Sequence, residues 1–156
     1  MGQEKVFLGL GSNTGNKNEN LMRAIENLSL ALGSPATLSS IIESEPWGFE
    51  SKSSFLNCVA AFDTALSPTG LLDIIESIEK QLGRTKKSTN GQYSDRPIDI
   101  DILFYGNECI NTERLTIPHP QLHKRNFVLI PLCEIAPQLI HPLLQKSIKE
   151  LIADIS

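Results

Sequence analysis

The stretch PIDIDILF, residues 97–104, places two aspartates in an otherwise apolar run that has the composition of a β-strand. Side chains alternate between the two faces of a strand, so Asp99 and Asp101 share one face and the isoleucines share the other. Neighbouring carboxylates repel each other, and aspartate is depleted in strands. Water on the open face of an edge strand would offset the repulsion, and so would a bound hard cation such as Mg²⁺. The pattern therefore predicts a strand with one core face and one face that is solvated or binds metal.

The segments before this strand predict the order strand, helix, strand, strand, helix, strand. The first helix is expected between the cap residue Asn16 and Gly33, and the second between the cap residue Ser67 and Gly83. The strands are expected at residues 5–10, 36–44 and 55–64, and at the stretch that holds the two aspartates. This order is the ferredoxin-like βαββαβ arrangement of the α+β class, an antiparallel sheet with both helices on one face.

The residues that follow form a C-terminal extension of this core. YGNE, residues 105–108, indicates a hairpin turn, and residues 115–127 form a connection bounded by prolines. SIKE, residues 147–150, has the spacing of a capping box and predicts the start of a last helix.

Length and composition indicate one globular domain over residues 1–156, because 40% of the residues are hydrophobic and 21% are charged. No apolar run approaches the roughly 20 residues of a membrane span, so no membrane association is expected. The cysteines at positions 58, 109 and 133 form no Cys-x-x-Cys unit, so neither a zinc site nor a disulfide framework is expected. Free thiols and the lack of an export signal favour the cytoplasm.

Charge is distributed unevenly along the chain. The net charge of −4 argues against a general nucleic-acid surface. Residues 83–97, however, carry four basic side chains, Arg84, Lys86, Lys87 and Arg96, and one acidic side chain, Asp95. A basic loop in an acidic chain favours a small anionic ligand, and long loops inside compact domains are usually functional or disordered.

The glycine-rich start GLGSNTGN, residues 9–16, invites comparison with nucleotide-binding loops. Its spacing misses the dinucleotide fingerprint G-x-G-x-x-G by one residue, and the chain lacks a P-loop sequence. We therefore expect Gly9, Gly11 and Gly15 to provide a tight turn and close helix–sheet packing.

Two further features have both an ordinary and a functional interpretation. Phe55 and Asn57 share a strand face and could cradle a flat heterocycle, although these residues alone favour a partly exposed phenylalanine and a surface asparagine. His119 lies between two prolines as a rigid loop histidine, which is either a surface residue or a donor to a phosphate oxygen.

Five collinear segments stand out along the chain: GLGSN (9–13), FLN (55–57), RPIDIDILFYG (96–106), LTIPHP (115–120) and RNFVLIPLCEIAP (125–137). Together they resemble the hydroxymethyl-dihydropterin pyrophosphokinases of folate synthesis. The resemblance covers nearly the whole chain. It implies a ferredoxin-like fold and transfer of pyrophosphate from ATP, the co-substrate, to the hydroxymethyl group of a reduced pterin, with release of AMP.

The resemblance also implies the site residues. Asp99 and Asp101 would hold two Mg²⁺ ions, and Arg84 and Arg96 would join them as catalytic residues. ATP would contact Glu79, Arg84, Lys86, Tyr93, Arg96, Ile102, Thr116, His119 and Arg125. The pterin would contact Ser44, Glu45, Trp47, Phe55, Asn57 and Phe127. The loops at residues 45–54 and 84–97 would close over the site.

Two other classes of function compete with this interpretation. An NADP-dependent oxidoreductase built on the glycine-rich start would need a second strand–helix–strand half that the chain lacks. A non-catalytic ferredoxin-like binding module would leave Asp99 and Asp101 as surface charges. We expect a monomer that acts on small molecules and binds no nucleic acid.

Overall fold

The computed structural model describes residues 2–45, 54–83 and 97–155. Its elements, in chain order, are β1 (Glu4–Ser12), α1 (Lys17–Leu32), β2 (Thr37–Leu38), β3 (Ile42–Ser44), β4 (Phe55–Thr64), α2 (Pro68–Gln81), β5 (Asp99–Tyr105), β6 (Ile110–Asn111), β7 (Thr116–Ile117), the 3-10 turn η1 (Leu122–Lys124), α3 (Asn126–Ile135) and α4 (Ile148–Asp154). The predicted α+β class and the ferredoxin-like order are confirmed.

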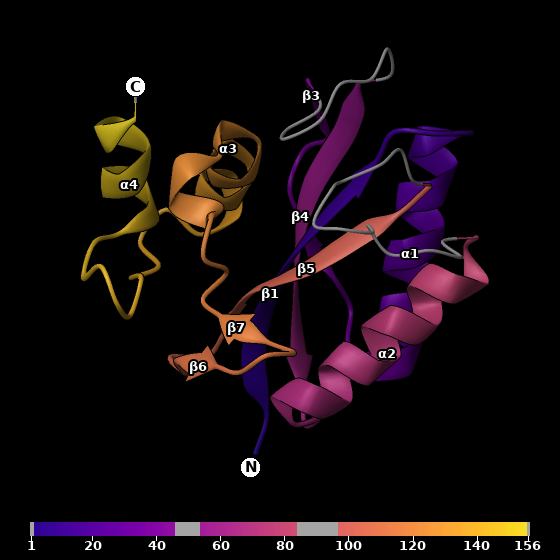
Figure 1. The fold of residues 1–156 in the computed structure, drawn as a ribbon, viewed down its shortest axis with the longest axis horizontal. Coiled ribbons are helices and arrows are strands. Elements are labelled where there is room, and N and C mark those ends of the chain that lie inside the picture. Colours follow the sequence, from indigo (N-terminus) through magenta and orange to yellow (C-terminus); the bar gives the residue numbers. More distant parts are fainter. Residues whose placement is uncertain (1, 46–53, 84–96, 156) are drawn as a thin grey trace.

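The main sheet is antiparallel, with the strand order β2-β4-β1-β5. Strand β3 also pairs directly with β4, at residues 55–57, whereas β2 pairs with β4 at residues 60–61. Helices α1 and α2 cover one face of the sheet, and α3 and α4 lie on the other side (Figure 1). No helix in the described ranges is both long enough and apolar enough to cross a bilayer.

Local sequence signals explain both early helices. The Asn16 side chain accepts a hydrogen bond from the Glu19 N–H at 3.1 Å, and Gly33 ends α1 in the left-handed conformation. The Ser67 hydroxyl accepts one from the Gly70 N–H at 3.1 Å, with Pro68 in the first turn of α2. These predicted caps are confirmed.

The predicted strand at residues 36–44 is divided into β2 and β3. Between them, Ser40 donates from both its N–H and its hydroxyl to the Glu134 carboxylate at 2.8 and 2.9 Å. The Ser39 hydroxyl accepts from the Val59 N–H at 2.8 Å. Side-chain hydrogen bonds thus replace part of the strand pairing between β2 and β3.

The C-terminal extension differs from expectation in two places. Glu108 N–H donates to the Tyr105 carbonyl at 3.0 Å and makes the predicted turn, but the hairpin that follows joins β6 to β7. Helix α3 was not anticipated, because Pro131 lies inside it. Burial of Val128, Leu129 and Leu132 against the sheet outweighs the missing N–H.

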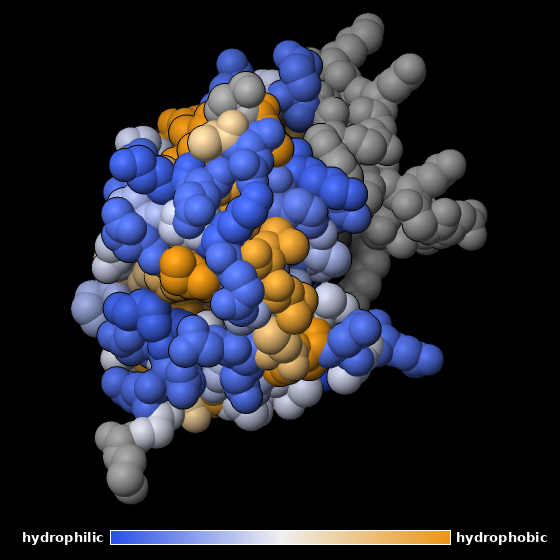
Figure 2. Space-filling model, turned by 90° about the vertical axis from the view of Figure 1, so that its left-hand side faces the viewer, coloured by the Kyte–Doolittle hydropathy of each residue, from blue (hydrophilic) through white to orange (hydrophobic). Residues whose placement is uncertain are grey.

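Two cores hold the layers together. The helix-side core lies between the sheet and α1 and α2, and it includes Leu8, Phe62, Ile75 and Ile100. The extension-side core lies between the sheet and α3 and α4, and it includes Phe7, Val59 and Leu103. Figure 2 shows the side of the molecule on which α4 lies, where apolar side chains interrupt the polar surface.

Candidate active site

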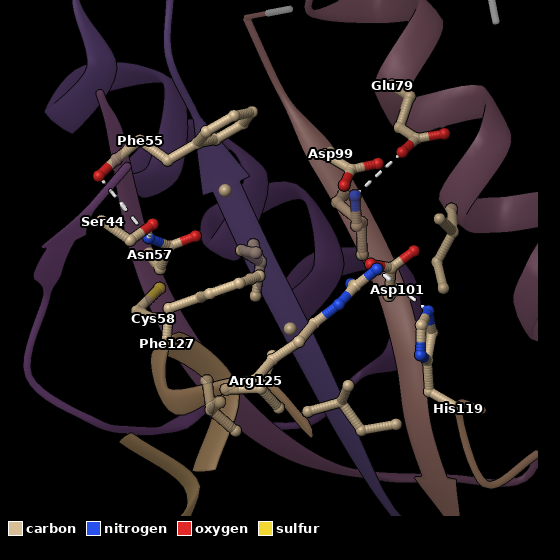
Figure 3. Close-up of a pocket in the computed structure, with 18 of the residues that line it drawn as sticks. Ser44, Phe55, Asn57, Cys58, Glu79, Asp99, Asp101, His119, Arg125 and Phe127 are labelled. Carbon is tan, nitrogen blue, oxygen red and sulfur yellow. Dashed lines mark hydrogen bonds and ion pairs between the residues drawn. The ribbon is translucent and has the colours of Figure 1, made fainter. Parts of the chain in front are cut away.

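A cavity of about 260 Å³ opens on the sheet face that carries α3. It lies next to the extension-side core, which covers another part of the same face. Strands β1, β4 and β5 form its floor, α2 borders it beyond the edge of β5, and the segment at residues 119–128 closes another side (Figure 3). Aromatic, amide and charged side chains from distant parts of the sequence thus meet in one hollow.

Two glycines of β1 form the centre of the floor. Gly11 pairs with Asn57 on one side and Asp99 on the other, and Gly9 pairs with Val59 and Asp101. Because glycine has no side chain, the β1 backbone is open between the two neighbouring strands. The expectation of a tight turn at Gly9 and Gly11 was wrong, since both lie inside a strand, whereas Gly15 does have a positive φ of 70°.

The close packing at Gly11 shows why no larger residue fits without displacement. A Cβ atom there would lie 3.1 Å from Asn57 Oδ1 and 3.3 Å from Phe55 Cδ1. At Gly9 the nearest atoms belong to the Leu103 side chain, at an ordinary 3.4 to 3.6 Å. The Asn57 and Phe55 positions therefore depend on Gly11.

The paired aspartates lie on one face of β5, as the alternation predicted, and that face borders the cavity. Ile100 and Ile102 point into the helix-side core, while Asp99 and Asp101 are half-buried in the cavity lining. The two aspartates line a concave site with His119 nearby, which favours a binding role over a plain solvated strand face.

His119 lies beside Asp101, with 3.9 Å between His119 Nε2 and Asp101 Oδ2. The Gln121 N–H donates to His119 Nδ1 at 3.1 Å, so the neutral ring carries its proton on Nε2. Burial and the nearby Arg125 charge lower the pKa of His119 to about 4, against an opposing effect of Asp99. The ring is therefore neutral at pH 7 and offers an Nε2–H donor in the cavity.

An aromatic and amide cradle lies across the glycine floor from the aspartates (Figure 3). Phe55 and Asn57 are only 7% and 6% exposed, so the favoured interpretation of a surface asparagine and a partly exposed phenylalanine is wrong. Asn57 Nδ2 donates to the Ser44 hydroxyl at 2.7 Å. The ring of Phe127 lies 5.6 Å from the Arg125 guanidinium carbon.

The other predicted site residues divide into three groups. Ser44, Glu45, Glu79 and Arg125 line the cavity. Ile102, in the helix-side core, and Thr116, on β7, are outside the lining. Outside the described residues are Trp47, Arg84, Lys86, Tyr93 and Arg96, together with most of the two loops that were expected to close.

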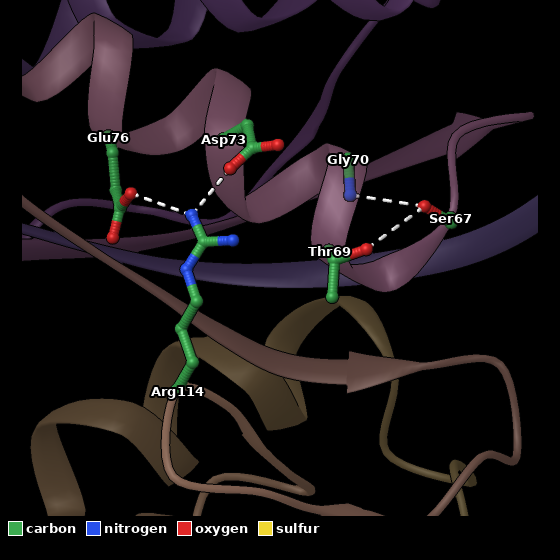
Figure 4. A network of polar contacts seen from close by, with 6 residues as sticks. All are labelled: Ser67, Thr69, Gly70, Asp73, Glu76 and Arg114. Carbon is green, nitrogen blue, oxygen red and sulfur yellow. Dashed lines mark hydrogen bonds and ion pairs between the residues drawn. The ribbon is translucent and has the colours of Figure 1, made fainter.

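Sequence reasoning missed one cationic residue at the rim. Arg114 lines the cavity and forms ion pairs with two residues of α2. Its Nη2 lies 2.5 Å from Asp73 Oδ1 and 2.8 Å from Glu76 Oε1 (Figure 4). It lies in the loop between β6 and β7, five residues before His119 in the sequence. Nearness in sequence to His119 was the available signal.

The carboxylates of Asp99 and Asp101 suit Mg²⁺ better than a metal ion whose ligands all come from the protein. Among the residues the structure describes, no group of three or more histidine, cysteine or acidic side chains forms a ready-made metal cage. Mg²⁺ typically keeps several waters and binds through one or two carboxylates together with substrate phosphates. Two carboxylates facing an open cavity match that requirement.

The comparisons with known proteins point to one family. Residues 7–137 match the model of 7,8-dihydro-6-hydroxymethylpterin-pyrophosphokinase (HPPK). A 2-amino-4-hydroxy-6-hydroxymethyldihydropteridine pyrophosphokinase of Porphyromonas gingivalis is 48% identical over 88% of this chain and 93% of its own. The protein of the same name from Aquifex aeolicus is 44% identical over 93% of this chain and 88% of its own.

A solved structure shares the fold. An HPPK-DHPS protein in complex with substrates aligns with a TM-score of 0.79 and 16% identity, and the match covers 99% of this chain and 43% of that one. The fold, the family model and the two similar sequences agree, and the chain belongs to the 7,8-dihydro-6-hydroxymethylpterin-pyrophosphokinase family.

Proposed function

We propose that this cavity transfers pyrophosphate from ATP to the hydroxymethyl group of 6-hydroxymethyl-7,8-dihydropterin and releases AMP. Family membership gives the pyrophosphokinase activity and its place in folate biosynthesis. The supporting observation from the structure is the arrangement of the floor, where an aromatic and amide cradle and a pair of carboxylates lie on opposite sides of two glycines.

The cradle suits a flat, polar heterocycle. Phe55 and Phe127 offer aromatic surface, and Asn57 has both a carbonyl acceptor and an amide donor for a ring edge. The bond from Asn57 Nδ2 to the Ser44 hydroxyl, at 2.7 Å, holds this amide in one orientation before a ligand arrives. A pre-oriented amide reduces the entropy cost of binding the pterin.

The opposite side suits a triphosphate. Asp99 and Asp101 would hold Mg²⁺, which when bound would neutralise phosphate charge and stabilise the charge that develops on the oxygens of the leaving group. The guanidinium of Arg125 and the Nε2–H of His119 are donors in the same cavity for phosphate oxygens. Phosphoryl-type transfer depends mainly on positioning and charge stabilisation, so no strong base is assigned.

The glycine floor connects these two functions. Because no side chain rises from Gly9 or Gly11, the hydroxymethyl group of a pterin at Asn57 can approach phosphates at the aspartates along the β1 backbone. Holding both reactants in one geometry supplies much of the rate enhancement in such reactions. The negative net charge and the free cysteines support a cytoplasmic enzyme of small molecules without a nucleic-acid partner. We expect it to act as a monomer.

The test is whether ATP consumption requires both the pterin and Mg²⁺. The purified chain should consume ATP only when both are present, and EDTA should abolish the reaction. Asp99→Asn and Asp101→Asn should each lower kcat by about a hundredfold or more, as for loss of a metal contact in the transition state. Asp63→Asn, which removes an exposed carboxylate at the far end of β4, should leave the rate unchanged.

Two results would contradict the proposal. ATP consumption at the same rate without the pterin would indicate an ATPase. Near-normal rates in both aspartate variants at limiting Mg²⁺ would remove the metal assignment.

A further inference from the structure

Glu79 occupies an unusual position for a buried acid. The residue is 8% exposed, and it lies in the last turns of α2, where the partial negative charge of the helix end disfavours a carboxylate. Asp99 and Asp101 add negative charge on the neighbouring strand. An apolar residue here would avoid the cost of burying a charge. The contacts of Glu79 therefore have to explain its presence.

One contact of Glu79 is to the backbone between the two aspartates. Glu79 Oε2 accepts a hydrogen bond from the Ile100 N–H at 2.9 Å (Figure 3). Strand β5 is the last strand in the order of the described sheet, with β1 on its other side. An N–H on that outer edge has no neighbouring strand to bond with, and the Glu79 carboxylate takes the place of one.

This bond constrains the position of the aspartates. The Ile100 N–H belongs to the planar peptide that joins Ile100 to Asp99, so holding it fixes the plane of that peptide. The Ile100 side chain is buried in the helix-side core, to which Ile75 and Ile78 of α2 also belong, and this packing fixes the same residue from a second direction. With Ile100 held twice, the backbone positions of Asp99 and Asp101 are set before any ligand binds.

We propose that Glu79 is a positioning residue that holds the strand bearing Asp99 and Asp101, through the Ile100 N–H, in the geometry that binds the metal and its nucleotide. This inference rests on the proposed function and goes beyond the expectation that Glu79 contacts ATP. The role proposed for the carboxylate is that of a hydrogen-bond acceptor for the Ile100 N–H.

Two substitutions at Glu79 distinguish the effect of its hydrogen-bond acceptor from that of its negative charge. Glu79→Gln removes the charge but keeps a carbonyl oxygen that can accept from Ile100. Glu79→Met removes both at similar size. Glu26→Met removes one carboxylate from the exposed surface of α1, outside the cavity lining, and controls for the change in net charge.

The first readout is Mn²⁺ binding in the presence of α,β-methylene-ATP, followed by the EPR signal of free Mn²⁺. Loss of a residue that orients metal ligands typically costs about 10- to 100-fold in metal affinity. Glu79→Met should weaken Mn²⁺ binding by about that factor and should lower kcat as well. The Mn²⁺ affinities of Glu79→Gln and Glu26→Met should stay within about threefold of that of the unaltered chain. That change is well below the loss of affinity expected when a residue that orients metal ligands is removed.

The second readout is amide hydrogen exchange at Ile100 without ligand. The Ile100 N–H should be protected in the unaltered chain and in Glu79→Gln, and should exchange at least tenfold faster in Glu79→Met. This measurement needs no catalytic activity and so reports the hydrogen bond by itself.

The outcomes are distinguishable. Unchanged Mn²⁺ affinity in Glu79→Met, or a loss in Glu79→Gln as large as in Glu79→Met, would overturn the inference. If Glu79→Met does not fold, Glu79→Gln still decides, because a tenfold loss of Mn²⁺ affinity there would show that the charge matters. If the unaltered chain neither binds Mn²⁺ nor forms AMP, the proposed function fails, and the positioning role fails with it.

Discussion

A methyl group added at Gly11 is expected to weaken pterin binding while leaving the fold intact. The new Cβ would lie 3.1 Å from Asn57 Oδ1 and 3.3 Å from Phe55 Cδ1, closer than ordinary van der Waals contact. Asn57 is 6% exposed, and its amide is held by the 2.7 Å bond to Ser44. The amide can therefore retreat only by straining that bond or by moving the Phe55 ring.

The size of the effect follows from these contacts. Weakening one hydrogen bond costs about 1 kcal/mol, and overpacking a tight site costs about 1–3 kcal/mol. If about 1.4–2.8 kcal/mol of this appears in pterin binding, the KM for the pterin rises about 10- to 100-fold. The KM for ATP should change by less than about twofold, since the strained contacts lie on the cradle side of the floor.

The assay is steady-state kinetics with each substrate varied in turn, on protein whose thermal unfolding has been checked. Gly9→Ala is the matched variant, because the atoms nearest to its Cβ would belong to the Leu103 side chain, at an ordinary 3.4 to 3.6 Å. It should raise the pterin KM less than Gly11→Ala does. A folded Gly11→Ala variant with an unchanged pterin KM would show that Asn57 and Phe55 do not form the pterin cradle.

Three other predictions concern reactivity and stability. Burial raises the pKa of the Cys58 thiol to about 12, so a thiol reagent at pH 8 should modify exposed Cys109 first and Cys58 only after unfolding; rapid modification of Cys58 in the native protein would contradict this. Ser147→Ala removes the hydroxyl that accepts from the Glu150 N–H at 3.1 Å, and should cost about 1 kcal/mol of unfolding free energy in urea titrations. Phe62→Ala empties a helix-side core site that is 1% exposed and should cost about 3–5 kcal/mol; a loss below about 1 kcal/mol would place Phe62 outside a packed core.

The parts of the fold with strong local signals could be predicted from the sequence. The caps at Asn16 and Ser67 and the alternation in β5 depend on residues close in sequence. Helix α3 was missed because Pro131 opposes it locally, and only burial of its apolar side chains against the sheet outweighs that cost. The division at Ser40 depends on Glu134, a residue 94 positions away.

The candidate site shows the same division between local and distant information. That Asp99 and Asp101 share a strand face was evident from their spacing. The position of Gly9 and Gly11, between the two aspartates and the cradle, was not evident from the sequence. It depends on the register of β1 with β4 and β5. Asn57 was judged a surface residue for the same reason, since its partners Ser44 and Gly11 come from two other strands. Likewise, Glu79 bonds Ile100 across 21 positions of sequence.

The most direct measurement is the identity of the nucleotide product. The purified chain, given Mg²⁺ and ATP with and without 6-hydroxymethyl-7,8-dihydropterin, should produce AMP only with the pterin, in equal amounts with a diphosphorylated pterin detected by ³¹P NMR. ADP with a monophosphorylated pterin would mean ordinary kinase chemistry and would contradict pyrophosphate transfer. If a folded sample binds ATP but forms no nucleotide product, the cavity is a binding site without this chemistry.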